Sequence, residues 1–145
     1  MPLLPEKDFC RIYKKTPRLT VDVVVCSTGG SVLLTKRAIP PYRGMWHLPG
    51  STLRMQESLM KAAVRVVKME TGLAVKSIKI LGQIEFPRIR RLGITMHDVS
   101  IVVLCTLKGG KIKPDKNTSA VEFFTKIPAP IIPHHRKFLK SHTLL

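Results

Sequence analysis

Acidic residues are scarce in this 145-residue chain, in which 9 Asp and Glu stand against 25 Lys and Arg for a formal charge of +16. Such an excess favours anionic partners, among them nucleotides, polyphosphates, nucleic acid and an anionic membrane surface. The alternative is that the charge only serves solubility. Charge alone does not name the ligand.

Long hydrophobic runs are also missing. The longest, at residues 23–26 and 101–105, are far below the roughly 18–20 residues that span a bilayer. The N-terminus lacks the charged start and apolar stretch of a signal peptide. The only three cysteines are far apart and have no CxxC spacing, which favours buried free thiols over disulfides or a zinc site. The sequence therefore predicts a cytoplasmic protein without a membrane partner.

Apolar residues, by contrast, are plentiful. Hydrophobic residues make up 44% of the chain and charged residues 23%, which excludes a disordered basic tail and leaves enough material for a core. The length fits one domain, and no repeat is visible. We expect a single domain over residues 1–145, with an N-terminal extension at 1–18 and a basic C-terminal helix and tail at 133–145.

Strand-like segments surround one amphipathic segment. Residues 20–26 and 31–37 read as strands joined by a hairpin turn at Gly29-Gly30. Residues 57–70 have apolar side chains at three- and four-residue spacings, which predicts a helix that Gly72 ends. Further strands are expected at 75–84, 94–107 and 121–126, with a turn at 109–110. This order predicts a mixed α/β sandwich.

The chemically informative segment joins a glycine loop, Leu48-Pro49-Gly50, to this helix. Glu57 and Arg65 are eight residues apart, about two helical turns, so a pair between them would tie the loop to the helix. Glu70 lies at the C-terminal end, where the helix dipole disfavours a negative charge and invites a cation. Hard divalent metals prefer oxygen ligands, which the loop carbonyls could also supply. The alternative is an exposed glutamate on an ordinary surface helix.

With these residues, the stretch from Gly30 to Leu73 resembles the Nudix hydrolases, whose signature is G-x5-E-x7-R-E-U-x-E-E-x-G-U, where U is apolar. Aligned on Glu57, the chain keeps six of the signature positions, namely Glu57, Arg65, Val67, Glu70, Gly72 and Leu73. The resemblance implies an α/β/α sandwich around a mixed β-sheet, with the signature forming a loop, a helix and a loop. It also implies a divalent cofactor, Mg2+ (or Mn2+), and a nucleoside-diphosphate substrate.

Three signature positions differ from the family pattern. The opening glycine is Ser51, the glutamate after the arginine is Val66, and the first glutamate of the pair is Met69. In the family, three helix glutamates face one point and bind the magnesium that holds a pyrophosphate. Valine and methionine neither coordinate a hard cation nor accept a proton, so only Glu70 remains of the three.

The GDP-mannose mannosyl hydrolase branch of the family also lacks these two glutamates, and the chain resembles it loosely from Leu4 to Asp115. In that branch the last glutamate, a glycine carbonyl and a glutamine bind one magnesium, and a histidine is the base. The resemblance carries the first two ligands over to Glu70 and Gly50. The glutamine and histidine align with Asn117, which offers an oxygen, and with Thr118, which cannot act as a base near neutral pH. The resemblance to this branch also implies a homodimer. It assigns phosphate or substrate contacts to four residues: Arg37, Arg65, Asp22 and the nearby Arg54. For Arg37 and Arg65, bracing of the fold is the alternative.

Other residues are therefore candidates for the base. His97 is at a strand end, and Asp98 beside it points to the opposite face, so the two cannot form a dyad. Glu122 could be a ligand or base on a loop, and Glu85, after a strand, could be a replacement ligand. For each, the alternative is a side chain without a catalytic task.

Two basic clusters, Arg88–Arg91 and the segment from His134 to His142, lie outside the signature. Arg88–Arg91 could contact a phosphate chain or a nucleic-acid backbone non-specifically, or form a solvated basic loop. The C-terminal segment is expected to be a surface helix rather than a metal site. Trp46 could stack on a base or sugar, or pack in the core.

Two functions follow from the sequence. One is a metal-dependent hydrolase of a nucleoside-diphosphate-linked compound, with a nucleotide sugar such as GDP-mannose favoured. The other is a Nudix-fold module without hydrolytic power that binds nucleotide or, weakly, nucleic acid through its basic surface.

Overall fold

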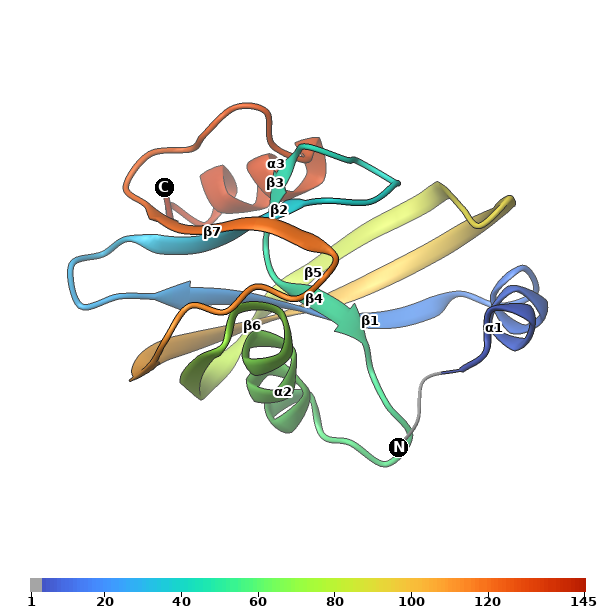
Figure 1. The fold of residues 1–145 in the computed structure, drawn as a ribbon, viewed down its shortest axis with the longest axis horizontal. Helices are drawn as coiled ribbons and strands as arrows, with labels where there is room; N and C mark the ends of the chain where they lie inside the picture. The colour runs from blue at the N-terminus through green and yellow to red at the C-terminus, as the bar shows by residue number, and fades with distance from the viewer. Residues whose placement is uncertain (1–3) are drawn as a thin grey trace.

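A strongly curved mixed β-sheet organises residues 4–145, which are the residues that the computed structural model describes (Figure 1). Residues 1–3 of the predicted N-terminal extension lie outside this range. The strands are β1 (Arg18–Cys26), β2 (Val32–Arg37), β3 (Trp46–His47), β4 (Gly50–Thr52), β5 (Leu73–Arg91), β6 (Ile94–Gly110) and β7 (Thr118–Phe124). Their order is β3-β2-β1-β6-β5, with β4 added to β1 and β7 added to β2. β1 and β6 run parallel, and the other strand pairs are antiparallel.

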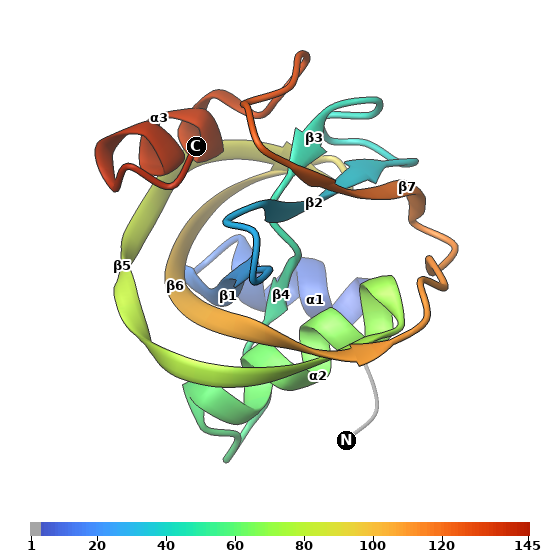
Figure 2. The ribbon, with the colours of Figure 1, turned by 90° about the vertical axis from the view of Figure 1, so that its left-hand side faces the viewer.

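The predicted strands at 75–84 and 94–107 are parts of one long hairpin, in which β5 has 19 residues and β6 has 17. Figure 2 shows both strands curling around the molecule. The hairpin turns at Leu92-Gly93, where both residues have positive φ. Two predictions are wrong as a result: Arg88–Arg91 is part of a strand rather than a loop, and Gly109-Gly110 pairs with the start of β5 instead of forming a turn. Pairing between β5 and β6 holds both the arginine-rich end of β5 and the glycine end of β6 in the sheet.

Three helices in the described part of the chain flank the sheet: α1 (Glu6–Tyr13), α2 (Leu59–Thr71) and α3 (Pro133–Ser141). α2 begins two residues later than predicted because the Ser58 hydroxyl accepts a hydrogen bond from the Lys61 N–H and caps the helix. Gly72 ends it with φ 80°, and a Cβ there would lie 2.8 Å from the Lys113 nitrogen. Within residues 4–145, no helix is both long and apolar enough to cross a bilayer.

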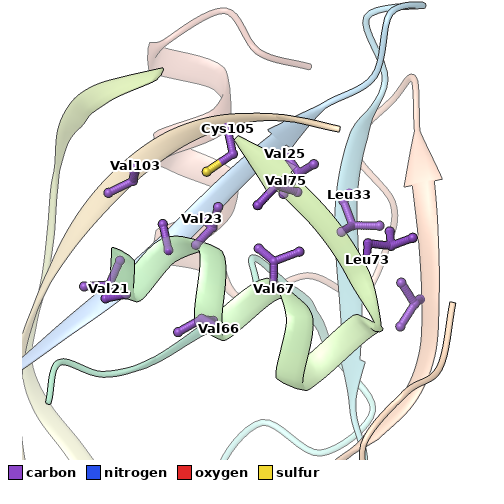
Figure 3. Packing of buried hydrophobic residues seen from close by; sticks show 13 residues of the cluster. Val21, Val23, Val25, Leu33, Val66, Val67, Leu73, Val75, Val103 and Cys105 are labelled. Atoms are coloured by element: carbon purple, nitrogen blue, oxygen red, sulfur yellow. The ribbon is translucent and has the colours of Figure 1, made fainter. Parts of the chain in front are cut away.

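The core has two parts, one on each face of the sheet. On the α2 side, alternate valines of β1 pack against one helix face (Figure 3), made of Ala62, Ala63, Val66 and Val67. On the other side, Leu34 and Leu48 pack against Phe138 and Leu139 of α3. Trp46 belongs to this second part and meets Phe124 edge-on at 4.8 Å between ring centroids, which supports packing rather than stacking on a ligand. Helices on both faces of a mixed sheet confirm the predicted α/β/α sandwich.

A buried ion pair that the sequence did not reveal joins the start of β1 to β6. Arg18 Nε lies 3.0 Å from Asp98 Oδ1, and Arg18 Nη2 lies 2.5 Å from Oδ2. Arg18 Nη1 also donates to the Thr52 hydroxyl of β4 at 3.3 Å. One guanidinium therefore connects three strands next to residues 48–58, which run from the glycine loop to the start of α2 and are called the signature loop below.

Removing the acidic partner tests this connection. Asp98→Ala should lower the free energy of unfolding by about 3–5 kcal/mol, because it leaves a buried guanidinium without its counter-charge. Asp8→Ala is the matched control, since its pair with Arg11 is exposed (66% for Arg11, 41% for Asp8) and should change stability by less than about 1 kcal/mol. Urea denaturation measures both. Equal effects of the two substitutions would contradict the prediction.

Candidate functional site

Gly50, the first residue of β4, lies between β1 and the end of α2. Its N–H donates to Glu70 Oε2 at 3.3 Å, and its Cα pairs with that of Asp22 across the two strands. A Cβ at this position would collide with the Asp22 carboxylate, so a larger residue would force that side chain to move. The Val23 N–H donates to the Pro49 carbonyl at 2.8 Å and fixes the loop just before Gly50. The structure thus brings together three predicted site residues: Glu70, Gly50 and Asp22.

Glu70 is half-buried, and its carboxylate lies in an unfavourable electrostatic position. Burial raises the pKa of Glu70 to about 8, and the negative charge of Asp115 adds to the rise. Asp22 acts in the same direction, whereas the Gly50 N–H and the Arg37 charge oppose it. A carboxylate that is short of water and near two other carboxylates is stabilised in its charged form by a cation.

The donors around Glu70 fit part of a metal coordination shell. No three His, Cys, Asp or Glu side chains among residues 4–145 are grouped so that they could hold a metal ion by themselves. Mg2+ commonly takes one or two carboxylates and completes its shell with water and substrate phosphate oxygens. The Glu70 carboxylate and the Gly50 carbonyl fit this incomplete set.

The third predicted ligand, Asn117, belongs to a turn that contacts the end of α2. The Asp115 N–H donates to the Glu70 carbonyl at 3.3 Å, and the Asn117 N–H donates to Asp115 Oδ1 at 3.0 Å. The Asn117 side chain is exposed, and its role as a ligand stays a prediction. Asp115, which sequence reasoning missed, is the carboxylate of this turn that acts on Glu70.

The predicted pair between Glu57 and Arg65 is confirmed. Arg65 Nε lies 2.6 Å from Glu57 Oε2, and Nη2 lies 2.9 Å from Oε1. Arg65 Nη2 also donates to the Thr52 carbonyl at 3.0 Å, and Glu57 Oε1 accepts from the Arg54 N–H at 3.1 Å. Hydrogen bonding by Arg65 lowers the pKa of Glu57. These contacts favour bracing of the signature loop over phosphate contact for Arg65.

Of the two other predicted arginines, Arg37 ends β2 and Arg54 follows β4. Arg37 Nε donates to the Pro41 carbonyl at 2.5 Å, so this side chain holds the loop that follows β2. Burial lowers the pKa of Arg37, while the charge of Glu70 opposes the shift. The Arg54 guanidinium points to Met69, with 3.9 Å between Nη2 and Sδ.

The remaining candidates lie on strands. Glu122 is an exposed residue of β7 opposite Leu34, so its predicted position on a loop is wrong. Glu85 lies inside β5 rather than after a strand. His97 is half-buried in β6, and the adjacent Asp98 is engaged by Arg18, in agreement with the expectation that they form no dyad. The catalytic roles of His97 and Glu122 stay predictions.

Two buried histidines near the loop were not predicted as site residues. Burial and the neighbouring His135 lower the pKa of His47 to about 3. His47 Nδ1 lies 2.6 Å from the Leu48 carbonyl, and the two histidine rings are 6.1 Å apart. The predicted basic C-terminal helix exists, but it is not wholly a surface helix, because His135 is buried whereas His134 beside it is exposed. The sequence signal for this buried face was the pair of apolar residues, Phe138 and Leu139, three and four positions after His135.

A family model described as "NUDIX domain" matches residues 16–141. The chain belongs to the Nudix family. An ADP-ribose pyrophosphatase of Methanocaldococcus jannaschii is 32% identical to this Nudix chain over 127 residues, which is 87% of this chain and 73% of the relative. The low-salt glycan biosynthesis protein Agl8 of Haloferax volcanii is 37% identical over 82 residues, or 57% of this chain and 52% of that protein. A MutT NUDIX hydrolase structure from Burkholderia pseudomallei has a TM-score of 0.74 and 25% identity, covering 86% of this chain and 97% of that one.

The raised pKa of Glu70, about 8, predicts how pH changes the stability of the metal-free protein. Between about pH 5 and 8 the folded state keeps a proton that the unfolded chain releases, so this group lowers stability as the pH rises. Asp115, Asp22 and Arg37 are the charged groups that act on it. Glu70→Gln should therefore gain stability over the unsubstituted protein as the pH rises from 5 to 8.

Thermal unfolding with a chelator present measures this difference. The exposed Glu6 on α1 provides the matched control, and Glu6→Gln should follow the unsubstituted protein across the same range. Parallel curves for Glu70→Gln and the unsubstituted protein would show that the carboxylate titrates normally.

Proposed function

We propose that the chain is a divalent-metal-dependent hydrolase of nucleoside diphosphates linked to a sugar. The observation that carries this proposal is the Glu70 carboxylate set against the Gly50 backbone in a Nudix fold. ADP-ribose, the substrate in the name of the Methanocaldococcus relative, belongs to this chemical class. The loss of the same two glutamates as in the GDP-mannose branch favours GDP-mannose within the class. Three free cysteines in the described structure support a reducing location, the cytoplasm.

The chain's own residues divide the work in this proposal. Glu70 and the Gly50 carbonyl hold the metal, which supplies charge neutralisation for the diphosphate. Arg37, whose charge acts on Glu70, adds positive potential beside the phosphates. The pair of Glu57 and Arg65 keeps the loop in place. His97 and Glu122 are the proposed candidates for the base.

A second function, binding without hydrolysis, is favoured by the two substituted positions. Val66 is 1% exposed and packs in the core beneath α2. Met69 is 48% exposed, and its sulfur lies 3.7 Å from Arg65 Nη1 and 3.9 Å from Arg54 Nη2. Neither side chain supplies an oxygen ligand, so a basic site beside Met69 could hold a nucleotide without cleaving it.

Turnover with Mg2+ on ADP-ribose, GDP-mannose and a set of other nucleotide sugars, followed by product separation, decides between the two. We expect hydrolysis of at least one compound. In Glu70→Gln, kcat should fall by about 100-fold or more, the scale of loss seen when a group that stabilises charge in the transition state is removed. Glu6→Gln is the control and should keep the full rate. Binding of these nucleotides without hydrolysis would refute the enzyme and support the binding module. Strong binding of an oligonucleotide that weakens steeply with salt would point to nucleic acid instead.

A further inference from the structure

His135 of α3 makes a buried contact with the signature loop that no catalytic assignment uses. The Leu48 N–H donates to His135 Nδ1 at 2.9 Å, and His135 is 4% exposed. We propose that His135 is a positioning residue for the metal-binding loop, acting through the Leu48 N–H. This inference rests on the proposed function, because it concerns the loop that presents the Gly50 carbonyl.

The hydrogen bond fixes the state of the imidazole. A ring nitrogen that accepts a hydrogen bond carries no proton, so in the neutral ring the proton lies on Nε2. Nε2 in turn lies 3.4 Å from Asp22 Oδ2. His135 thus joins the loop on one side to β1 on the other, and both of its nitrogens have partners.

The start of α3 is held in register with β3, which precedes the loop. The Trp46 N–H donates to the Pro130 carbonyl at 2.9 Å, and the Ile132 N–H donates to the Trp46 carbonyl at 3.0 Å. The resulting β-bridge joins Trp46 of β3 to Ile131, two residues before α3 begins. Because α3 begins at Pro133, directly after this bridge, His135 is placed over Leu48.

From Leu48 the constraint reaches the proposed metal ligands within two residues. The Pro49 carbonyl is fixed by the Val23 N–H, and the Gly50 N–H is directed to Glu70. The loop is therefore held by α3 at its first residue and by α2 at its last. Releasing the first contact frees the loop to move while the apolar side chains of α3, Phe138 and Leu139, still keep the helix on the sheet.

Two substitutions separate the contacts of the ring. In His135→Asn the side-chain oxygen takes the place of Nδ1 and can still accept from Leu48. In His135→Gln the amide nitrogen takes the place of Nε2 and keeps only the contact with Asp22. The control is His134→Asn, because His134 is the exposed neighbour that packs on Phe86.

Three measurements test the inference. Imidazole nitrogen NMR of the unsubstituted protein should show Nδ1 unprotonated and Nε2 protonated. The Leu48 amide should exchange with solvent about tenfold faster in His135→Gln than in His135→Asn. Mn2+ affinity and kcat should also fall by about tenfold in His135→Gln, the usual scale for partners that orient metal ligands, and by less than about threefold in the two asparagine variants. The nucleotide KM should change little.

The outcomes are distinguishable from failure of the proposed function. Absence of turnover in the unsubstituted protein would refute that function, whereas the nitrogen and Leu48 measurements would still decide the role of His135. A proton on Nδ1 would overturn the inference without any variant. Equal losses in the two position-135 variants, or a larger loss in His135→Asn, would overturn it as well, because the contact with Asp22 or simple packing would then explain the effect.

Discussion

The close approach of Gly50 to Asp22 is the constraint on which the rest of the site depends. Without a Cβ, Gly50 packs directly against the Asp22 carboxylate, and its N–H meets Glu70 at the end of α2. This brings a carboxylate against the C-terminal end of its own helix dipole and close to Asp115 and Asp22. The site therefore gathers three carboxyl groups in a chain whose overall charge is +16.

The signature loop is stabilised from both sides of the sheet. On the α2 side, the bidentate pair of Glu57 and Arg65 joins the loop to the helix. On the α3 side, His135 accepts from Leu48. The loss of the two family glutamates has different physical consequences, since Val66 adds to the core whereas Met69 exposes an apolar side chain between two guanidinium groups.

Features set by local sequence were predictable, and those set by distant pairing were not. The apolar spacing predicted α2, and the eight-residue separation predicted the pair of Glu57 and Arg65. The length of β5 was missed because residues 85–91 include Pro87 and four charged residues, which pairing with β6 nevertheless holds in the sheet. The pair of Arg18 and Asp98 spans 80 residues and the contact of Leu48 and His135 spans 87, so only the folded topology brings them together.

The central claim is that Glu70 and the Gly50 loop bind a divalent cation. Titration with Mn2+, followed by electron paramagnetic resonance of the free ion, tests it without a substrate. We expect one bound Mn2+ per chain. The Mn2+ affinity should fall by about tenfold or more in Glu70→Gln, since even the loss of a residue that orients a metal ligand has an effect of this size. It should be unchanged in Glu6→Gln. Equal affinities in the unsubstituted protein and in Glu70→Gln would contradict the account.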